Sequence, residues 1–478
     1  MAKLARSSFL SMWSHPNLYT DEGRRAGKGT GKELADLVVV FGDHVLIFSD
    51  KHCAFPKHPD LNVSWRRWYS SAVEKSARQL LGAKRWLERF PNRIYRDAGC
   101  MERFPVSLPS PGVAKIHLIA VTRGSYEACR EHFGGGSTGS LMVVTSLRGT
   151  EAHTSPFCVG HVLADGPFVH VLDEMTVEIL LSEFDTATDF TTYLVRREKF
   201  LSTEGKYVIA HGEEDLVVAY SVRIDKNGEH SFPEASPKYA AVVVKEGAWE
   251  EYRRDARYKA KKSADLQSYA WDRLIELMIA TGESEDGASS EPYLRTMAAE
   301  PRLSRRVLAE QMSRAFNREL RPMQRFVITT VSPKPPRVVY LFIALPAPFG
   351  CGTYDEYRQL RRDHVFACCQ MAKLRFPPAT KIVGIAREPM AWVDGTFEIM
   401  FIEGDDQPMS SEVARVVEDM QIELGITDSS VDRMHVLPLH EFPAPEGARA
   451  RMSPASRLLE RQRLRDLVRI KVRKKLTD

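Results

Sequence analysis

The fold is decided by the stretch Asp36-Leu-Val-Val-Val-Phe-Gly-Asp-His-Val-Leu-Ile-Phe-Ser-Asp-Lys51. Two runs rich in β-branched and apolar residues flank the dipeptide Gly42-Asp43, which favours a two-residue turn, so the sequence predicts a β-hairpin. With this turn the residue numbers of antiparallel partners sum to 85, which places Asp36 opposite Ser49. Because side chains alternate between the faces of a strand, Ser49 and Lys51 are expected on one face and Asp50 on the other.

A long helix is predicted after this hairpin. Ser64 can cap a helix that reaches about Phe90, with apolar residues at helical spacing, and Pro91 ends it. Further strands are expected at 115–121 and 141–145, and helices at 176–181 and 185–197. Residues 1–200 are therefore predicted to form a mixed sheet flanked by helices.

The rest of the chain is predicted to hold two more regions and a tail, and the whole is assigned to the α/β class. Residues 201–325 are expected to be an α+β middle region, with strands at 207–210, 216–222 and 239–244 and helices at 264–280 and 304–316. Residues 326–445 are expected to be an α/β region, with strands at 338–345, 381–386 and 396–402 and helices at 354–374 and 411–424. Residues 446–478 form a basic tail.

Composition limits the class of protein. The 478 residues are 43% hydrophobic and 27% charged, which is normal for a globular chain and predicts two to four domains. No apolar run approaches the length of a membrane span, and the N-terminus lacks an apolar signal-peptide core. The seven cysteines are scattered without a CxxC pair, so neither a disulfide framework nor a zinc ribbon is expected, and a cytoplasmic location is predicted.

Charge is unevenly distributed along the chain. From Arg449 to Asp478 there are eleven lysines and arginines against three acidic residues, whereas the whole chain has a net charge of only +4. The remainder is therefore mildly acidic. A basic tail on an acidic body indicates an acidic partner such as nucleic acid, although a solvated tail without a partner is an equal alternative.

The predicted hairpin brings together residues that suit phosphodiester hydrolysis. A carboxylate at Asp36 can hold a divalent metal ion, and an ammonium at Lys51 can position an attacking water or a phosphate oxygen. For an isolated lysine, a solubilising charge at a strand end would be the better interpretation. The predicted cross-strand proximity of Lys51 and Asp36 favours a catalytic interpretation.

This arrangement resembles the core of the PD-(D/E)XK nuclease superfamily, in which an acid on one strand and a D/E-x-K tripeptide on the next bind Mg²⁺ and activate water. An acidic residue from a preceding helix and a Gln or Glu on the following helix often join them. The matching positions here are Glu33, Asp36, Lys51, Glu74 and Gln79.

The resemblance covers residues 33–79 and implies a restriction-endonuclease-like domain. It further implies Mg²⁺ (or Mn²⁺) as cofactor and nucleic acid as substrate, with DNA favoured over RNA. A restriction or anti-phage effector is the nearest analogy, with a homo-oligomer or a defence-system partner protein left open.

One position departs from the pattern. Ser49 stands where the tripeptide should begin with Asp or Glu, so the second metal ligand must come from elsewhere. Glu74 on the following helix is the favoured substitute. Asp50 is the alternative, if a bulge turns it inward. A third interpretation is a catalytically degenerate nuclease fold that acts as a nucleic-acid-binding or scaffold protein.

Four basic residues are candidates for contacts with phosphates. Lys28 and Lys32 lie in the stretch Gly27-Lys-Gly-Thr-Gly-Lys32, which fails as a P-loop because Glu33 replaces the Mg²⁺-binding Ser/Thr and no strand precedes it. Arg66 and Arg67 lie between Trp65 and Trp68, aromatic residues that are expected in the core. The structural alternative for Glu74 is an ordinary ion pair with Arg78.

Overall fold

The structure is a computed structural model. It describes residues 2–27, 29–134, 137–234, 241–281, 290–322, 324–331, 337–389, 396–426 and 440–444. Lys28 and the basic tail therefore lie outside the described residues. No helix within these ranges is long and apolar enough to cross a membrane.

The first sheet has six strands in the order β4-β1-β2-β3-β5-β8. Its strands are β1 (Ser14–Thr20), β2 (Lys32–Phe41), β3 (His44–His52), β4 (Ile94–Tyr95), β5 (Lys115–Arg123) and β8 (Val169–Asp173). Strands β1, β2 and β3 are antiparallel neighbours, whereas β3, β5 and β8 are parallel. The predicted mixed sheet in an α/β fold is confirmed.

The β2–β3 hairpin has the predicted register. Leu37 pairs with Phe48 and Phe41 pairs with His44, and Gly42 adopts a φ of 56° in the turn, which favours glycine. The two faces of the hairpin belong to different cores. Val38, Val40, Val45 and Ile47 pack in one hydrophobic cluster, and Leu37, Val39, Leu46 and Phe48 pack in another.

The helix after the hairpin is longer than predicted and contains an irregular turn. It consists of α3 (Leu61–Tyr69), the π-helical turn η1 (Ser70–Glu74) and α4 (Lys75–Arg89). Asp60 caps it by accepting a hydrogen bond from the Asn62 backbone N–H at 2.8 Å, so the predicted cap at Ser64 is wrong. Ser64 instead lies buried within the helix. Single π-helical turns inside α-helices are frequent at functional sites.

Eight further elements complete the first region. They are the helices α1 (Ala2–Phe9), α2 (Glu22–Arg25), α5 (Tyr126–Phe133), α6 (Glu174–Glu183) and α7 (Ala187–Leu201), the short 3₁₀ helix η2 (Thr150–Ala152), and strands β6 and β7 described below. The α3–α4 helix contacts β2, β3 and β5, whereas α1 and α6 pack against each other. Both faces of the first sheet are thus covered by helices, because both carry apolar side chains.

A second sheet joins strands from both sides of residue 200. Its order is β10-β9-β6-β7, with β6 (Met142–Arg148), β7 (Cys158–His161), β9 (Tyr207–Ala210) and β10 (Ala241–Val243). The predicted strand at 216–222 is wrong, because this segment forms the helix α8 (Glu213–Ser221). All nine residues of α8 are buried, so the continuous apolar run reflects burial on every side rather than a strand.

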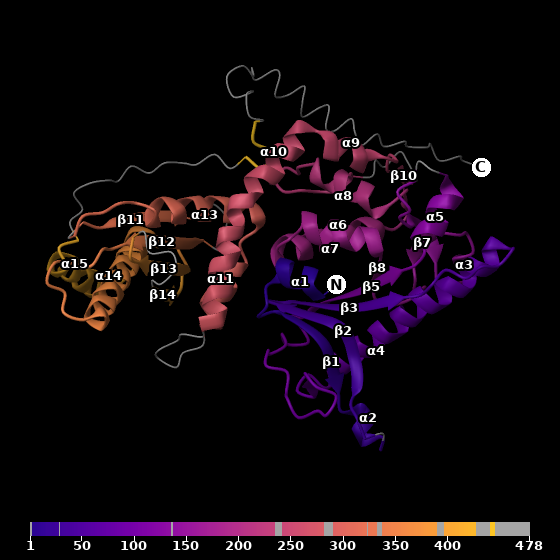
Figure 1. Cartoon of the computed structure of the whole chain (residues 1–478), viewed down its shortest axis with the longest axis horizontal. Helices are drawn as coiled ribbons and strands as arrows, with labels where there is room; N and C mark the ends of the chain where they lie inside the picture. Colours follow the sequence, from indigo (N-terminus) through magenta and orange to yellow (C-terminus); the bar gives the residue numbers. More distant parts are fainter. Residues whose placement is uncertain are drawn as a thin grey trace.

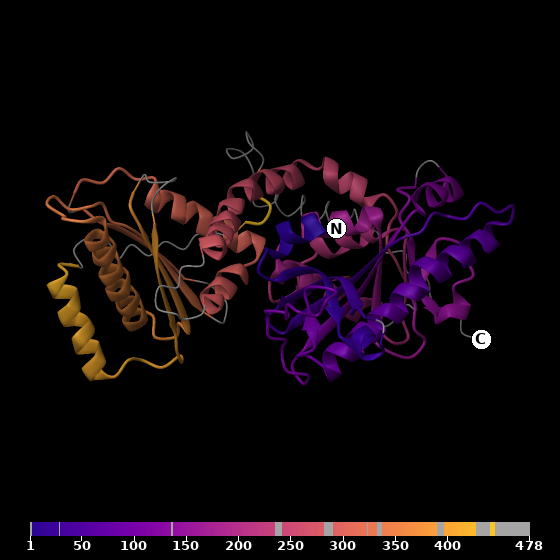
Figure 2. The same cartoon turned by 60° about the horizontal axis from the view of Figure 1, so that its bottom comes forward.

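A helical segment connects this part to the third sheet. Its elements are α9 (Ala248–Arg254), α10 (Ala256–Asp265), η3 (Leu266–Ser268), α11 (Tyr269–Thr281), α12 (Glu291–Ala298) and α13 (Arg302–Phe316). Figures 1 and 2 show the first and third sheets toward opposite ends of the molecule, with α11 between them.

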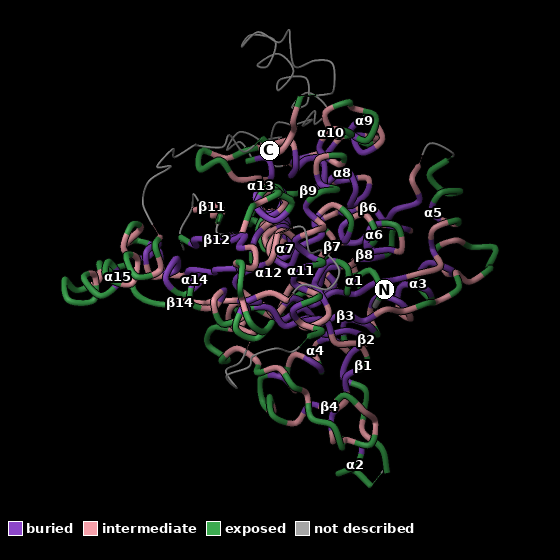
Figure 3. Tube along the Cα trace, turned by 60° about the vertical axis from the view of Figure 1, so that its left-hand side comes forward, coloured by how far each residue is buried: buried purple, intermediate pink, exposed green. Residues whose placement is uncertain are grey.

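The third sheet has the order β11-β12-β13-β14. Its elements are β11 (Phe326–Val331), β12 (Val338–Ala344), α14 (Tyr354–Arg375), β13 (Lys381–Arg387), β14 (Phe397–Glu403) and α15 (Ser411–Glu423). The predicted strand–helix–strand–strand–helix order is confirmed, and β11 is an additional edge strand. Helix α14 covers one face, and α11 and α13 contribute to the core on the other. The central strands are buried, whereas α2 and α15 are largely exposed (Figure 3).

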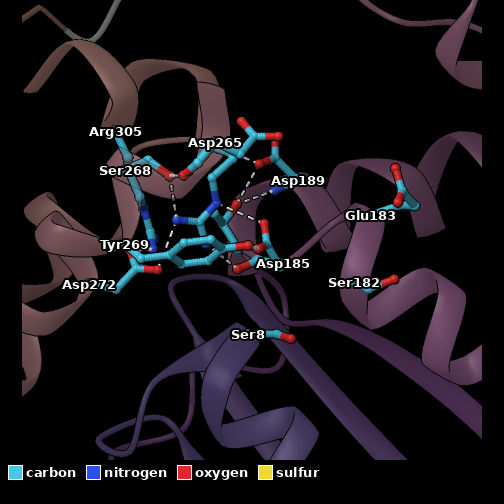
Figure 4. Close-up of polar contacts among 12 residues, drawn as sticks. Ser8, Ser182, Glu183, Asp185, Asp189, Asp265, Ser268, Tyr269, Asp272 and Arg305 are labelled. Atoms are coloured by element: carbon cyan, nitrogen blue, oxygen red, sulfur yellow. Dashed lines mark hydrogen bonds and ion pairs between the residues drawn. The ribbon is translucent and has the colours of Figure 1, made fainter. Parts of the chain in front are cut away.

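Buried ion pairs attach the helical segment to the first region. Arg302 pairs with Asp185, in the α6–α7 connection, and with Asp272 on α11, each at 2.8 Å. Arg305 pairs with the other oxygen of Asp272 at 2.6 Å. Figure 4 shows Asp185, Asp272 and Arg305 around Tyr269, whose hydroxyl donates to Asp185. Each of these charged groups has a partner, so the cluster serves to hold the segments together.

Candidate functional site

Asp36 lies half-buried in β2, beside the end of β3. Its Oδ2 accepts a hydrogen bond from the Asp50 backbone N–H at 2.8 Å. Its Oδ1 has no hydrogen bond to any described residue. One carboxylate oxygen is thus fixed by the neighbouring strand, which orients the other for a ligand.

Ser49 links the end of β3 to helix α4. Its side chain is fully buried, and its Oγ lies 3.3 Å from the Ser76 Oγ and 3.4 Å from the Gln79 Oε1. The structure therefore brings Gln79 beside the position that carries an acid in the nuclease pattern. Asp36 shares this face of the sheet by strand alternation from Val38.

Lys51 follows Ser49 by two residues and so lies on the same face. It is half-buried and pairs with Thr122 of β5 in the parallel register. Within the described residues no acidic side chain lies within 4.0 Å of its ammonium group, and this includes Asp36 and Glu74. The ammonium is therefore available to an anionic ligand.

Asp50 lies on the opposite face of the sheet. Its carboxylate accepts two hydrogen bonds from Arg123, at 2.8 and 3.2 Å, and this interaction raises the pKa of Arg123. Pairing between β3 and β5 continues regularly through Ser49, Asp50 and Lys51. No bulge turns Asp50 toward Asp36.

Glu74 ends the π-helical turn η1 and is half-buried. Its Oε2 accepts a hydrogen bond from the Ser70 Oγ at 2.8 Å. No hydrogen bond or ion pair joins it to Asp36, Ser49 or Lys51, all of which the structure describes. The alternative ion pair with Arg78 is also absent between these two described side chains.

The remaining described candidates are Glu33 and three basic residues. Glu33 is exposed on β2 opposite Tyr19 of β1, so it belongs to a strand and not to a preceding helix. Lys32 pairs with Glu22 at 2.9 Å. Arg66 and Arg67 are exposed on α3, whereas the aromatic residues that flank them are buried as predicted.

A histidine cluster was missed from the sequence. His44, His117 and His170 lie near the starts of β3, β5 and β8, and Glu198 of α7 lies close to His117 and His170. Burial lowers the pKa of His117 to about 4 and holds the pKa of His170 well below its usual value. Each strand contributes one histidine, and only the parallel register brings them together. Three histidines that lie on separate strands, far apart in the sequence, give no motif.

Comparison with known proteins gives no match to a protein-family model, to a curated protein or to a solved structure.

Proposed function

We propose that this chain is an Mg²⁺-dependent nuclease that hydrolyses phosphodiester bonds, with DNA favoured over RNA. The carrying observation is that Asp36, Ser49 and Lys51 share one face at the end of β3, with Gln79 of α4 against Ser49. Lys51 has no acidic partner among the described residues. The proposal extends to a cytoplasmic restriction or anti-phage effector, acting as a homo-oligomer or with a defence-system partner.

Asp36 fits a hard divalent ion, because its free Oδ1 is an oxygen donor beside the strand end. Mg²⁺ would supply Lewis-acid stabilisation of charge on the scissile phosphate. Lys51 donates hydrogen bonds to a phosphate oxygen and orients the attacking water. Gln79 and Ser49 provide polar contacts that keep this water in place. Glu74, one helical turn from Ser70, is the carboxylate of the following helix that we assign as the second ligand of the ion.

Ser49 favours one alternative. It is fully buried and contacts Ser76 and Gln79. The position that carries the metal-binding Asp or Glu in the nuclease pattern therefore carries a neutral hydroxyl here. A nuclease fold with this substitution could bind nucleic acid as a scaffold without cleaving it. The two functions differ in their need for a divalent ion.

A cleavage assay separates these functions. The purified full chain is incubated with single- and double-stranded DNA and RNA, with Mg²⁺, with Mn²⁺ or with EDTA. A nuclease cleaves at least one substrate only when the ion is present. Binding of nucleic acid that is insensitive to EDTA, without cleavage in any condition, would establish the scaffold instead.

Two variants are expected to identify the second carboxylate. Glu74→Gln should lose metal-dependent cleavage, because Mg²⁺ sites usually draw on one or two carboxylates. Asp50→Asn should largely keep it, because Asp50 is paired with Arg123 on the opposite face. Initial rates over a Mg²⁺ titration measure both. The reverse pattern would assign the ligand to Asp50, and restored cleavage in Glu74→Gln with Ser49→Glu would show that the carboxylate had moved.

Deletion of residues 449–478 is expected to weaken binding of nucleic acid and to leave the hydrolytic centre intact. The deletion removes eleven basic residues but keeps Glu441, which pairs with His230 at 2.6 Å. If the tail neutralises phosphates, the plot of log binding constant against log salt becomes less steep. An unchanged slope would assign the tail to docking or to a protein partner.

A further inference from the structure

We propose a second metal site, in which His117, His170 and Glu198 bind a divalent transition ion of the Zn²⁺ class. The site lies on the opposite face of the first sheet from Ser49, near the starts of the parallel strands. It shares no residue with the proposed nuclease centre. The inference is therefore independent of the proposed function.

Three elements bring the ligands together. His117 lies on β5, His170 lies on the neighbouring strand β8, and Glu198 reaches them from α7. One ligand atom from each residue lies within 4.8 Å of the others, and the His170 Nε2 lies 3.8 Å from the Glu198 Oε2. Donors held about 2.1 Å from one tetrahedral ion are roughly 3.4 Å apart. Small side-chain rotations are enough to close this set around an ion.

Two ring nitrogens in this cluster have no hydrogen-bond partner in the part of the chain that the structure describes. They are the Nδ1 of His117 and the Nε2 of His170. Their side chains are 4% and 0% exposed, so bulk solvent does not reach them. Buried polar atoms are nearly always satisfied in native proteins, and an unpaired one is unfavourable. An ion bound by both nitrogens removes this cost at both positions.

The other ring nitrogen of each histidine is within hydrogen-bond distance of a neighbouring side chain. The His117 Nε2 lies 2.9 Å from the Nδ1 of His44, with the two rings stacked. The His170 Nδ1 accepts from Arg197 at 3.1 Å, and Arg197 is fixed by Glu213. Such outer contacts orient histidine ligands in metal sites.

The Arg197 contact would change when an ion binds. Arg197 is always a donor, so the Nδ1 of His170 accepts and the neutral ring carries its proton on Nε2. The neutral ring would bind an ion at Nε2 once this proton has moved to Nδ1, and Arg197 would then keep its pair with Glu213.

The donor set selects the kind of ion. Two imidazole nitrogens and one carboxylate suit Zn²⁺ and similar transition ions, whereas Mg²⁺ prefers oxygen alone. Three protein ligands leave a fourth position for water or another ligand. Glu198 is 42% exposed, so solvent reaches the carboxylate side of the site.

Titration of the full chain with Co²⁺, followed by its visible absorption, tests the site, with Zn²⁺ added afterwards as competitor. One equivalent of Co²⁺ is expected to give a spectrum of low coordination number that Zn²⁺ abolishes. Glu198→Gln should weaken binding about tenfold or more, and His117→Gln further. Asp36→Asn and His58→Gln, an exposed loop histidine, should bind like the wild type.

A thermal measurement keeps the test decisive if the buried histidine variant folds poorly. Zn²⁺ should raise the unfolding midpoint of the wild type, because an ion bound only to the folded state stabilises it. It should raise the midpoint of Glu198→Gln, whose altered group is 42% exposed, clearly less at the same Zn²⁺ concentration. Equal Co²⁺ spectra and equal Zn²⁺ stabilisation in wild type and Glu198→Gln would overturn the proposal, as would the absence of binding in the wild type.

Discussion

Lys51→Ala is expected to reduce Mg²⁺-dependent cleavage about 10²-fold or more while leaving the protein folded. The half-buried ammonium lies on the face of β3 that carries Ser49, and no described acid neutralises it within 4.0 Å. Its truncation removes stabilisation of the charge that develops on the phosphate, which is typically about 3 kcal/mol. It removes little packing, because Lys51 lies at a strand end. Single-turnover rates at saturating Mg²⁺ measure the effect.

Lys115→Ala is the matched control for this variant. Lys115 is also a strand-end lysine of the first sheet, but it is exposed and lies at the start of β5. It should cleave like the wild type. Wild-type cleavage rates in Lys51→Ala, together with an unchanged circular dichroism spectrum, would remove Lys51 from the site.

Arg302→Met is expected to destabilise the protein by about 3–5 kcal/mol, the usual cost of breaking a buried ion pair from one side. The Arg302 side chain is 7% exposed and pairs with both Asp185 and Asp272. Its removal leaves the Asp185 carboxylate with only the Tyr269 hydroxyl as a described side-chain partner. The midpoint of urea unfolding, monitored by tryptophan fluorescence, reports the loss because Trp271 lies beside Asp272.

Two further variants test whether the loss of stability in Arg302→Met comes from the buried ion pairs. Lys245→Met removes a largely exposed ion pair with Glu251 and should change stability by less than about 1 kcal/mol. Adding Asp185→Asn to Arg302→Met should recover part of the lost free energy of unfolding. The second substitution removes the buried carboxylate charge that has no cationic partner once Arg302 is replaced. Equal effects of Arg302→Met and Lys245→Met would mean that the buried pairs do not hold the helical segment to the first region.

Local chemistry was sufficient for several elements of the fold. The Gly42-Asp43 turn set the hairpin register, because a two-residue turn leaves the partners of both strands no freedom. Strand alternation then placed Ser49 and Asp50 on opposite faces. The third region was also predictable, since long apolar strands alternate there with an amphipathic helix that begins at the capping residue Thr353.

Local chemistry failed where burial overrode periodicity or where pairing partners are distant. Helix α8 is enclosed on every side, so its apolar run carries no period that separates helix from strand. Strand β1 was missed because it includes Pro16 and Asn17 and is stabilised by pairing with β2. The helix begins after Asp60 and not after Ser64, because the Asp60 carboxylate, one turn earlier, accepts a hydrogen bond from the Asn62 backbone N–H.

By itself the sequence determined the α/β class, which follows from the order of apolar strands and amphipathic helices. It also determined the hairpin and the common face of Asp36, Ser49 and Lys51, which follow from turn chemistry and strand alternation. Only the tertiary structure decided which distant groups meet these residues. It placed Gln79 against Ser49, paired Asp50 with Arg123 and gathered His117, His170 and Glu198. Parallel neighbours are selected by the packing of the helices that connect them, and no local pattern encodes that packing.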